Sequence, residues 1–541
     1  MLSSPPRSRT IRPAAALVLT LTLAAVACGE PPAPTQPTAA DRAASALASD
    51  IRPAEQHLHT LAREVEGFGG YFIDSNGVVV GYVTDLARGE ALRRRLEAAV
   101  RAGRLGSRTR SIAIRKGQFD FPSLARWRDI VSGQLLGIVP GVVMSDADEA
   151  ANRVTIGIDE AKHPGVRADV MGALERLGVP VNAVRFIASG PVSPDVAQPV
   201  ASTAALALNR DLLDVPSPVV AGYRIFAPGP CTLGPVVEHN GNAAAVTNSH
   251  CTSAMYAFDG SSLSTSDFAT IGHEQLDPNA TCGANCRRSD AVVEYLDAGV
   301  AWDLGRIART VNVTFTWGTA GSLDVDQGNP TRDVIAVVGY WDVVTGMEVY
   351  KTGSRTGTTG GVISATCSDE MGSDGFMRAC SIRSTYYSSG GDSGSPVYTY
   401  IPGTGGAQVR LVAIHWGSNS AGHFTLASYF SWVTSEIPGT FVATRPSPLS
   451  AYITGATDVN NDPSCRLRYQ AVVTGGAGEP YTYAWNTDGV IHEDYGDVVY
   501  AAFPGAVDAR FIEVTVTDAV GATVTAGLGI TTGPWYDMCY T

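Results

Sequence analysis

Hydrophobic residues in the N-terminal part of the chain recur with the spacings of both strands and helices. Two apolar runs between Gly70 and Thr84 flank the pair Asn76-Gly77, which is typical of a tight hairpin turn. The segment from Val154 to Ile158 alternates as a strand does. Apolar residues three or four positions apart predict three helices, with faces at Leu92, Leu96 and Val100, at Leu124, Trp127, Val131 and Leu135, and at Val166, Val170, Leu174 and Leu177. Residues 51–190 are therefore predicted to form an α/β region.

The pattern changes to short alternating runs and glycine turns from Gly222 onward. Over residues 222–445 such runs predict an all-β barrel domain. Residues 446–541 continue with alternation, most clearly at 481–485 and 512–517, and predict a separate β-sandwich. The predicted fold class is therefore multidomain, with an α/β region followed by two all-β domains.

Two segments lack any core pattern. Residues 29–50 are rich in Pro, Ala and Thr, which is typical of a tether. Residues 191–221 carry five prolines among Ser, Ala and Val, which predicts a linker and processing region.

Composition and charge narrow the class of protein. A chain of 541 residues is too long for one core, and its 58 glycines favour turn-rich β structure. The net charge of −13 argues against nucleic acid as a partner. Outside the first thirty residues, no apolar segment is long enough to span a bilayer.

The first 28 residues resemble an export signal. Three arginines precede an apolar stretch from Ala14 to Val26, and small residues up to Ala27 fit a cleavage site. The next residue, Cys28, indicates a bacterial lipoprotein whose acylated cysteine becomes the new N-terminus. The usual lipobox has Leu where this chain has Ala25, so ordinary secretion after Ala27 is the alternative. The chain is expected to leave a bacterial cell, either secreted or lipid-anchored at the envelope.

The cysteine count supports export. Nine cysteines leave eight after Cys28, and an even number in an exported chain indicates a disulfide framework. Neighbours along the chain form natural pairs, although eight cysteines allow 105 connectivities. The inferred pairs are Cys231 with Cys251, Cys282 with Cys286, Cys367 with Cys380, and Cys465 with Cys539.

Three separated segments carry the side chains of acyl-transfer chemistry. Ser393 lies in a glycine turn that can present its hydroxyl and point backbone N–H groups at one place. Serine needs a base to act as a nucleophile at neutral pH, and His250 lies upstream. Between them, Asp290 opens an apolar run. Hydrolases with a nucleophile elbow have the order Ser, Asp, His instead of His, Asp, Ser.

Several motifs together resemble chymotrypsin-fold serine proteases of the streptogrisin and α-lytic type over residues 222–440. These motifs are Cys231-Thr232-Leu233-Gly234, Cys286-Arg287-Arg288-Ser289-Asp290, Lys351-Thr352-Gly353, Gly391-Asp392-Ser393-Gly394 and Ile414-His415-Trp416-Gly417. The resemblance implies a double β-barrel and an endopeptidase that acts on proteins or peptides through His250, Asp290 and Ser393. It also implies an oxyanion hole at the N–H groups of Gly391 and Ser393, and a substrate cleft lined by His415, Trp416 and Gly417.

The resemblance also implies roles for four further residues in or near these motifs. Asp392 is expected to pair with a buried cation and to shape the oxyanion turn. Ser395 and His415 replace a glycine and a serine that relatives usually have, and His415 is expected to lie near the catalytic Asp. Tyr387 is expected near the base of the primary pocket.

The flanking domains resemble known modules. Phe121 to Asp129, Val139 to Val142 and Asn152 to Val154 resemble parts of streptogrisin and α-lytic pro-regions. This implies a zymogen whose own pro-region acts as folding catalyst and inhibitor; a cell-surface spacer is the alternative. Residues 446–541 resemble polycystic-kidney-disease or other immunoglobulin-like modules.

Other interpretations of these residues stay open. Asp267 and Asp303 lie in the same interval as Asp290. A catalytically silent cell-surface binding protein with a protease-like fold is the main alternative function, and an esterase is disfavoured by the residue order. The spacing of Cys282 and Cys286 does not fit a zinc ribbon, and residues 458–462 lack the ligands of a known calcium loop. No metal or cofactor is expected.

Overall fold

The computed structural model describes residues 52–534 apart from several short segments. The segments left out are 102–103, 106–108, 110, 197–210, 228, 280, 284, 327–333, 341–342, 402–405, 445–446, 477–480, 506–508 and 519–522. The predicted export signal, Cys28, the tether at 29–50 and Cys539 lie outside the described residues, so the predictions for them stay predictions. No helix among the described residues is long and apolar enough to cross a membrane.

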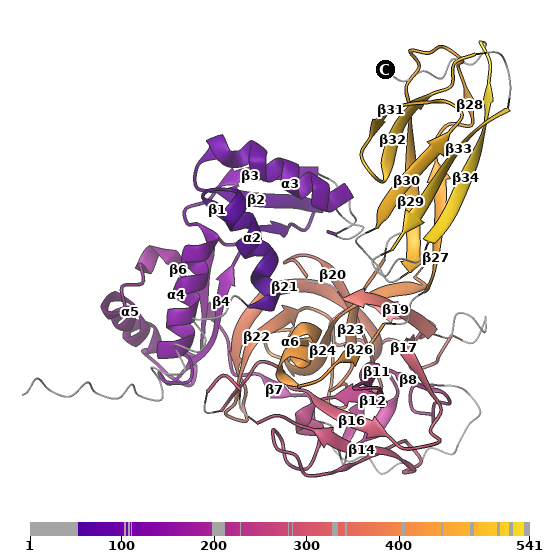
Figure 1. The fold of residues 1–541 in the computed structure, drawn as a ribbon. Coiled ribbons are helices and arrows are strands. Elements are labelled where there is room, and N and C mark those ends of the chain that lie inside the picture. Colours follow the sequence, from indigo (N-terminus) through magenta and orange to yellow (C-terminus); the bar gives the residue numbers. More distant parts are fainter. Residues whose placement is uncertain are drawn as a thin grey trace, which may run out of the picture. The chain divides into compact units, whose positions relative to one another are not determined.

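The N-terminal α/β region contains two small βα units (Figure 1). The first has a sheet of order β1-β2-β3, in which Gly77, with φ of +78°, forms the predicted hairpin turn. The second places β4, β5 and β6 beside α4 and α5. The elements are η1 (Pro53–Glu55), α2 (Gln56–Glu64), β1 (Phe68–Ile73), β2 (Val78–Val83), η2 (Leu86–Arg88), α3 (Gly89–Arg101), β3 (Ser111–Lys116), α4 (Phe121–Gln134), β4 (Val142–Asp148), β5 (Arg153–Ile158), α5 (Val166–Arg176), η3 (Val181–Ala183) and β6 (Val184–Ala188).

The predicted helical faces of this region are buried. Leu92 and Leu96 of α3, Leu124 and Val131 of α4, and Leu174 of α5 are at most 1% exposed and share one core. The hairpin, the strand at 154–158 and all three helices predicted from the sequence are present.

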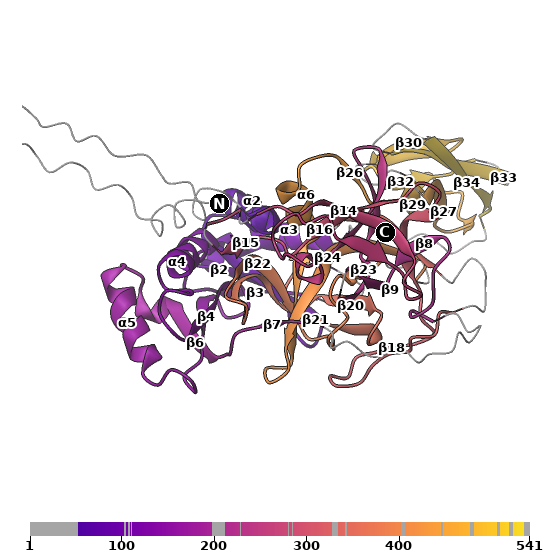
Figure 2. The same cartoon turned by 90° about the horizontal axis from the view of Figure 1, so that it is seen from below.

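The central part of the chain forms two sheets. An eight-stranded sheet has the order β10-β9-β13-β14-β16-β12-β11-β26, and Figure 2 shows β14 and β16 side by side. Its strands are β9 (Arg224–Phe226), β10 (Pro230–Thr232), β11 (Val236–His239), β12 (Asn242–Thr247), β13 (Ser262–Ser264), β14 (Thr270–Leu276), β16 (Val292–Leu296) and β26 (Phe441–Val442). The short helices η4 (Ser249–Cys251) and α6 (Phe430–Glu436) belong to this part of the chain.

The second sheet has fifteen strands, three of which are β4, β5 and β6. Its other strands are β7 (Ser193–Pro194), β8 (Val219–Ala221), β15 (Cys286–Arg287), β17 (Trp302–Ala308), β18 (Val313–Thr314), β19 (Val334–Tyr340), β20 (Glu348–Gly353), β21 (Gly357–Met371), β22 (Met377–Ser384), β23 (Pro396–Tyr400), β24 (Gln408–Asn419) and β25 (Phe424–Tyr429). The α/β region joins this sheet because β4 pairs antiparallel with the end of β21, where Ser145 lies opposite Asp369.

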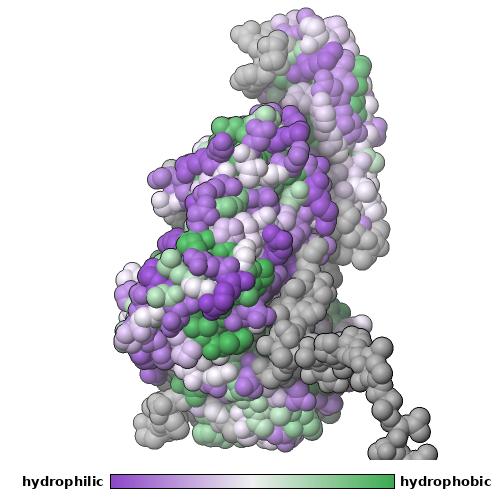
Figure 3. All heavy atoms as spheres, turned by 90° about the vertical axis from the view of Figure 1, so that its left-hand side faces the viewer, coloured by the Kyte–Doolittle hydropathy of each residue, from purple (hydrophilic) through white to green (hydrophobic). Residues whose placement is uncertain are grey.

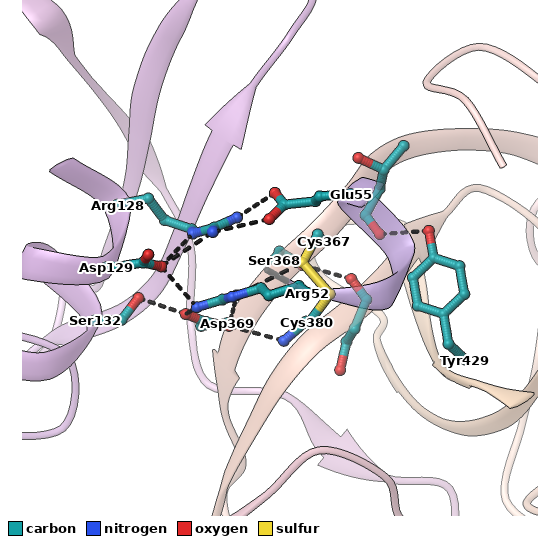
Figure 4. The surroundings of a disulfide bond; sticks show 12 residues. Arg52, Glu55, Arg128, Asp129, Ser132, Cys367, Ser368, Asp369, Cys380 and Tyr429 are labelled. Atoms are coloured by element: carbon teal, nitrogen blue, oxygen red, sulfur yellow. Dashed lines mark hydrogen bonds and ion pairs between the residues drawn. A yellow bond between two sulfur atoms is a disulfide. The ribbon is translucent and has the colours of Figure 1, made fainter. Parts of the chain in front are cut away.

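A buried ion cluster reinforces that junction (Figure 4). Arg52 donates to both carboxylate oxygens of Asp369, at 2.7 and 3.0 Å. Arg128 forms an ion pair with Glu55, and Asp129 accepts from Arg52 at 3.0 Å. Asp369 follows Cys367, whose disulfide to Cys380 appears beside the cluster in Figure 4. These charges are paired and hydrogen-bonded, as buried charges must be to be tolerated.

The C-terminal part forms two four-stranded sheets around one core. Their orders are β27-β29-β32-β31 and β28-β34-β33-β30, and inward residues such as Tyr469 and Val514 are fully buried. The strands are β27 (Ser447–Thr454), β28 (Asp458–Val459), β29 (Leu467–Gly476), β30 (Thr482–Thr487), β31 (Val490–Asp494), β32 (Val498–Ala502), β33 (Ala509–Thr517) and β34 (Thr523–Thr532). The predicted fold class, a β-rich multidomain chain with an α/β region, is confirmed.

The surface is thinly charged, as the 17% of charged residues implies. Figure 3 shows hydrophobic residues in small groups among hydrophilic ones on one face of the molecule. Scattered apolar residues of this kind are normal on soluble domains.

Candidate active site

The structure brings His250, Asp290 and Ser393 together from three separate segments. β12 and β16 pair with Thr247 opposite Val292, so the end of β12 lies beside the start of β16. His250 follows β12 in η4, and Asp290 lies just before β16. Ser393 lies on the turn that precedes β23 of the second sheet.

The distances form one chain of hydrogen bonds. His250 Nε2 lies 2.7 Å from the Ser393 Oγ, and His250 Nδ1 lies 2.9 Å from a carboxylate oxygen of Asp290. The other oxygen of Asp290 accepts from the His250 backbone N–H at 3.2 Å. This arrangement lets one imidazole nitrogen take a proton from serine while the carboxylate holds the other nitrogen protonated.

The Asp290 carboxylate is buried and kept ionised. Its side chain is fully buried, and Arg378 donates to it at 2.8 Å. Burial alone would raise the pKa of Asp290, but the attraction of His250 and of Arg378 lowers it below the ordinary value. Asp290 is therefore an anion at neutral pH and can hold the imidazole in place.

The glycine turn around Ser393 depends on left-handed backbone. Gly391 has φ of +107° and Gly394 has φ of +90°, conformations that a side chain would strain. A Cβ at Gly394 would also lie 2.2 Å from the carbonyl oxygen of Thr232. Glycine at both positions is therefore required for this turn.

Asp392 holds the turn from inside the domain. Its carboxylate pairs with Lys351 at 3.0 Å and accepts from the N–H groups of Arg355 and Thr356, each at 3.1 Å. The expected buried cation is thus Lys351. The hydroxyl of Ser395 donates to the carbonyl oxygen of Asp392, so the additional side chain at this position closes the turn instead of crowding it.

We expect Lys351→Met to destabilise the protein strongly, because the variant leaves the Asp392 carboxylate buried without its cation. Breaking one partner of a buried pair costs about 3–5 kcal/mol. Urea unfolding of Lys351→Met and of the double variant Lys351→Met with Asp392→Asn would test this. The double variant should recover part of the loss. Equal stability of the parent, the single variant and the double variant would contradict the pairing.

A second buried carboxylate lies on β16 behind the site. Both oxygens of Glu294 are buried without a hydrogen-bond partner among the described residues. Burial, aided by the nearby carboxylates of Glu274 and Asp259, raises the pKa of Glu294 from 4.5 to about 8. Glu294 is therefore protonated in the folded protein at neutral pH.

This shift predicts a pH-dependent effect of Glu294→Gln. The unfolded chain releases the proton above pH 4.5, whereas the folded chain keeps it until about pH 8. The free energy of unfolding of the parent therefore falls across that window, by several kcal/mol at most. Glu294→Gln lacks this loss, so its advantage over the parent should grow from pH 5 to pH 8. Urea unfolding at both pH values measures this difference in unfolding free energy, with Glu238→Gln on β11 as the control. A difference that does not change with pH would contradict the raised pKa of Glu294.

Two of the singled-out side chains have partners that the sequence did not indicate. His415 does not bond to Asp290: its Nδ1 lies 3.1 Å from the Tyr386 hydroxyl, and its Nε2 faces the Asp195 carboxylate. Tyr387 packs edge-on against Trp317. The buried tyrosine beside His415 is Tyr386, one residue earlier.

The other predicted cleft residues contact the chain's own segment around Asp195, and the alternative acids lie elsewhere. The Trp416 carbonyl oxygen accepts from the Asp195 N–H, and Gly417 pairs with Pro194 of β7. The Gly391 N–H donates to the carbonyl oxygen of Asp195, the residue after β7, at 2.7 Å. Asp267 accepts from Thr265, and Asp303 lies 3.6 Å from Arg306, so neither alternative acid reaches His250.

Three of the four inferred disulfides are present, joining Cys231 to Cys251, Cys282 to Cys286, and Cys367 to Cys380. Cys465 is disulfide-bonded, but its expected partner Cys539 lies outside the described residues. Within the described ranges, no group of three His, Cys, Asp or Glu side chains could hold a metal ion. Asp462, in the loop weighed as a calcium site, accepts from the N–H and hydroxyl of Ser464.

Sequence reasoning missed several residues of the site. Arg378 lies 88 positions from Asp290 along the chain, and no local pattern links the two. Ser388 and Ser418 were also not singled out, although they directly follow Tyr387 and Gly417, which were.

Comparison with known proteins gives matches only among solved structures. No family model and no curated protein matches the chain. A glutamic acid specific serine protease that uses a histidine triad in substrate binding is 21% identical, with 40% of this chain and 96% of that chain covered and a TM-score of 0.29. Protease A of Thermobifida fusca is 16% identical, covering 41% and 99%, with a TM-score of 0.29. A chymotrypsin of Cellulomonas bogoriensis is 19% identical, covering 41% and 99%, with a TM-score of 0.27. At this level of similarity, the solved structures say nothing of this chain's own activity.

Proposed function

We propose that this protein is a serine endopeptidase that hydrolyses peptide bonds through His250, Asp290 and Ser393. The observation that carries the proposal is the position of His250 between the other two side chains, at 2.7 and 2.9 Å. A buried, ionised carboxylate, a correctly placed imidazole and a serine on a glycine turn form a hydrogen-bonded triad of the kind that activates a hydroxyl.

The mechanism follows from this geometry. Ser393 Oγ attacks the carbonyl carbon of the scissile bond as His250 Nε2 takes the hydroxyl proton. Asp290 stabilises the imidazolium that results. His250 then gives the proton to the leaving amine, and an acyl-enzyme on Ser393 remains. Water, deprotonated by His250, hydrolyses the ester and restores the serine.

The developing oxyanion needs hydrogen-bond donors that are already in place. The Gly391 N–H points at a carbonyl oxygen in the site and lies on a turn held by Asp392. One such donor contributes about 2.7–4 kcal/mol to transition-state stabilisation. Together with the Ser393 N–H, it forms the oxyanion hole of the proposal.

Recognition of an extended backbone favours peptides over simple esters. β24 pairs antiparallel with β7, a short strand of the chain's own Pro-rich segment. Strand addition of this kind uses main-chain hydrogen bonds, which an ester without a peptide backbone cannot supply. A silent binding protein would have no need for an ionised Asp290 or for an activated serine.

The flanking regions complete the proposal. Disulfides persist in oxidising compartments, so the three bridges favour a protein that acts outside the cell. With the export-signal pattern, this supports secretion from a bacterial cell or a lipid anchor at Cys28. The α/β region acts as pro-region in this account, and the C-terminal sandwich acts in positioning or adhesion.

A digest of a peptide library with the purified, processed protein tests the proposal. We expect internal peptide bonds to be cut, with the activity lost after treatment with a serine-directed fluorophosphonate. Hydrolysis of small esters with no cut in any peptide would favour an esterase. Absence of both activities would favour the silent binding protein.

The proposed pro-region role predicts assisted refolding. Residues 196–541 should refold poorly alone and at least about tenfold better with residues 52–195 in trans, because β4 and the Arg52 cluster complete the second sheet. Arg52→Ala in the added fragment should weaken the effect, whereas Arg88→Ala, which removes only an exposed ion pair, should not. Recovered peptide hydrolysis measures the yield, and efficient unaided refolding would contradict the role.

A further inference from the structure

A short segment of the chain lies in the cleft as a substrate would. Ser193 and Pro194 form β7, which pairs antiparallel with β24 at Ser418 and Gly417. The N–H of the next residue, Asp195, donates to the carbonyl oxygen of Trp416 at 3.1 Å. A Cβ at Gly417 would lie 2.6 Å from the Ser193 carbonyl oxygen, so glycine permits this close approach.

The main-chain carbonyl of Asp195 faces the reacting groups. Its oxygen accepts from the Gly391 N–H at 2.7 Å and lies 3.1 Å from Ser393 Oγ. The same Oγ is 2.7 Å from His250 Nε2. The carbonyl that the serine can reach is therefore the one that joins Asp195 to Val196.

The Asp195 side chain fills a polar pocket made by three donors. Ser388 and Ser418 donate their hydroxyls to its two carboxylate oxygens, each at 2.6 Å, and His415 Nε2 lies at 2.9 Å. All three partners are less than 9% exposed, and Asp195 itself is 7% exposed. Each donor ends on a carboxylate oxygen, so an apolar side chain would leave all three unpaired.

Tyr386 sets the orientation of the histidine in this pocket. When His415 Nε2–H donates to the carboxylate, Nδ1 accepts from the Tyr386 hydroxyl at 3.1 Å, so a neutral imidazole makes both bonds. Burial would raise the pKa of Asp195, but the hydrogen bonds from His415 and the two serines lower it below the ordinary value. The pocket therefore stabilises a carboxylate anion.

We propose that the protein cleaves its own chain between Asp195 and Val196, and that the pocket of Ser388, His415 and Ser418 selects an acidic residue before the scissile bond. This inference rests on the proposed function and adds its substrate class and its processing site. Ser393 Oγ forms an ester with the Asp195 carbonyl carbon as the bond to the Val196 nitrogen breaks. His250 delivers the serine proton to that nitrogen, and water then releases Asp195 with a new terminal carboxylate.

The released end remains a ligand of the cleft. β7, the Asp195 side chain and the Arg52 cluster all hold the N-terminal fragment on the second sheet, and none of them depends on the cut bond. The fragment that ends at Asp195 is therefore an inhibitor of the mature enzyme until it dissociates or is degraded.

Self-cleavage is tested with the full chain expressed in four forms and followed by intact mass. The parent should yield an N-terminal fragment that ends at Asp195, and Ser393→Ala should stay uncut there. Asp195→Asn, which keeps the shape but not the charge, should slow the cut about 100-fold. Asp214→Asn, an acidic neighbour in the same linker, should be cut as the parent is. A fragment that ends elsewhere, or an unchanged rate for Asp195→Asn, would overturn the proposal.

Selectivity is tested on the mature enzyme with peptides that differ only in the residue before the scissile bond. We expect Asp to be cleaved about 100-fold faster than Asn in kcat/KM, and Phe and Ala to be cleaved poorly. His415→Ala should bring the Asp to Asn ratio close to one, and Ser388→Ala and Ser418→Ala, each lacking one oxygen, should reduce it if His415→Ala does not fold. Cleavage of peptides without preference for Asp would overturn the inference and leave the proposed function standing. No cleavage of any peptide would instead remove the proposed function.

Discussion

Ser393→Ala is expected to reduce peptide hydrolysis by about 10⁶-fold while the protein folds as before. The substitution removes only the oxygen that lies 2.7 Å from His250 Nε2. Ser393 is fully buried in this form of the chain, and the main-chain bonds of its turn do not use the hydroxyl. The loss should therefore be in kcat and not in unfolding free energy.

Turnover of one peptide and urea unfolding, measured on the same samples, separate these two quantities. Ser435→Ala is a matched control, because within the described part of the chain that hydroxyl bonds only the Trp432 carbonyl in α6. Normal turnover by Ser393→Ala would remove the serine from the mechanism. A large loss in both variants would point to misfolding.

Asp290→Asn is expected to lower turnover by about 10⁴-fold, because the amide favours the wrong tautomer of His250. The fold should survive, since Arg378 keeps its second carboxylate partner, Asp374, at 2.7 Å. Added alkali should partly restore activity by removing the imidazole proton, which a purely structural defect would not show.

Asp303→Asn is the control for this prediction. Asp303 lies in the same interval of the sequence but 3.6 Å from Arg306, on β17. A pH profile of kcat/KM for both variants distinguishes them. If Asp303→Asn lost activity and Asp290→Asn kept it, the acid would be assigned to the wrong residue.

Local patterns in the sequence predicted much of the fold. The hairpin around Gly77, the helical faces of α3, α4 and α5, and the two sandwich strands β30 and β33 follow from periodicity within about fifteen residues. The joining of β4 to β21 could not be predicted, since Ser145 and Asp369 pair across more than two hundred positions. Only the folded sheet brings such edges together.

The site shows the same division between local and distant information. The residue types and their order along the chain pointed to His250, Asp290 and Ser393, but the partner role of Arg378 depends on how two distant segments pack. His415 shows a subtler limit. Adjacent residues of a strand point to opposite faces, and the register of β24 shifts between His415 and Gly417. A one-residue difference in register therefore decides which face of β24 this side chain occupies, and here it lies in the pocket with Asp195.

The Asp195 pocket could not be predicted for a related reason. Ser388, His415 and Ser418 belong to the protease-like part of the chain, whereas Asp195 lies in the Pro-rich segment about two hundred residues earlier. Nothing in the sequence indicates that this aspartate, and not Asp211 or Asp214, reaches the cleft.

Labelling of the mature protein with a fluorophosphonate, followed by peptide mass mapping, tests the central claim most directly. The account predicts one label per chain, on Ser393, because among the described residues only that hydroxyl has a base at 2.7 Å and an N–H donor at the adjacent carbonyl site. His250→Ala should lose the label, and Ser435→Ala should keep it. An unlabelled protein, a label on another serine, or full labelling of His250→Ala would contradict the account.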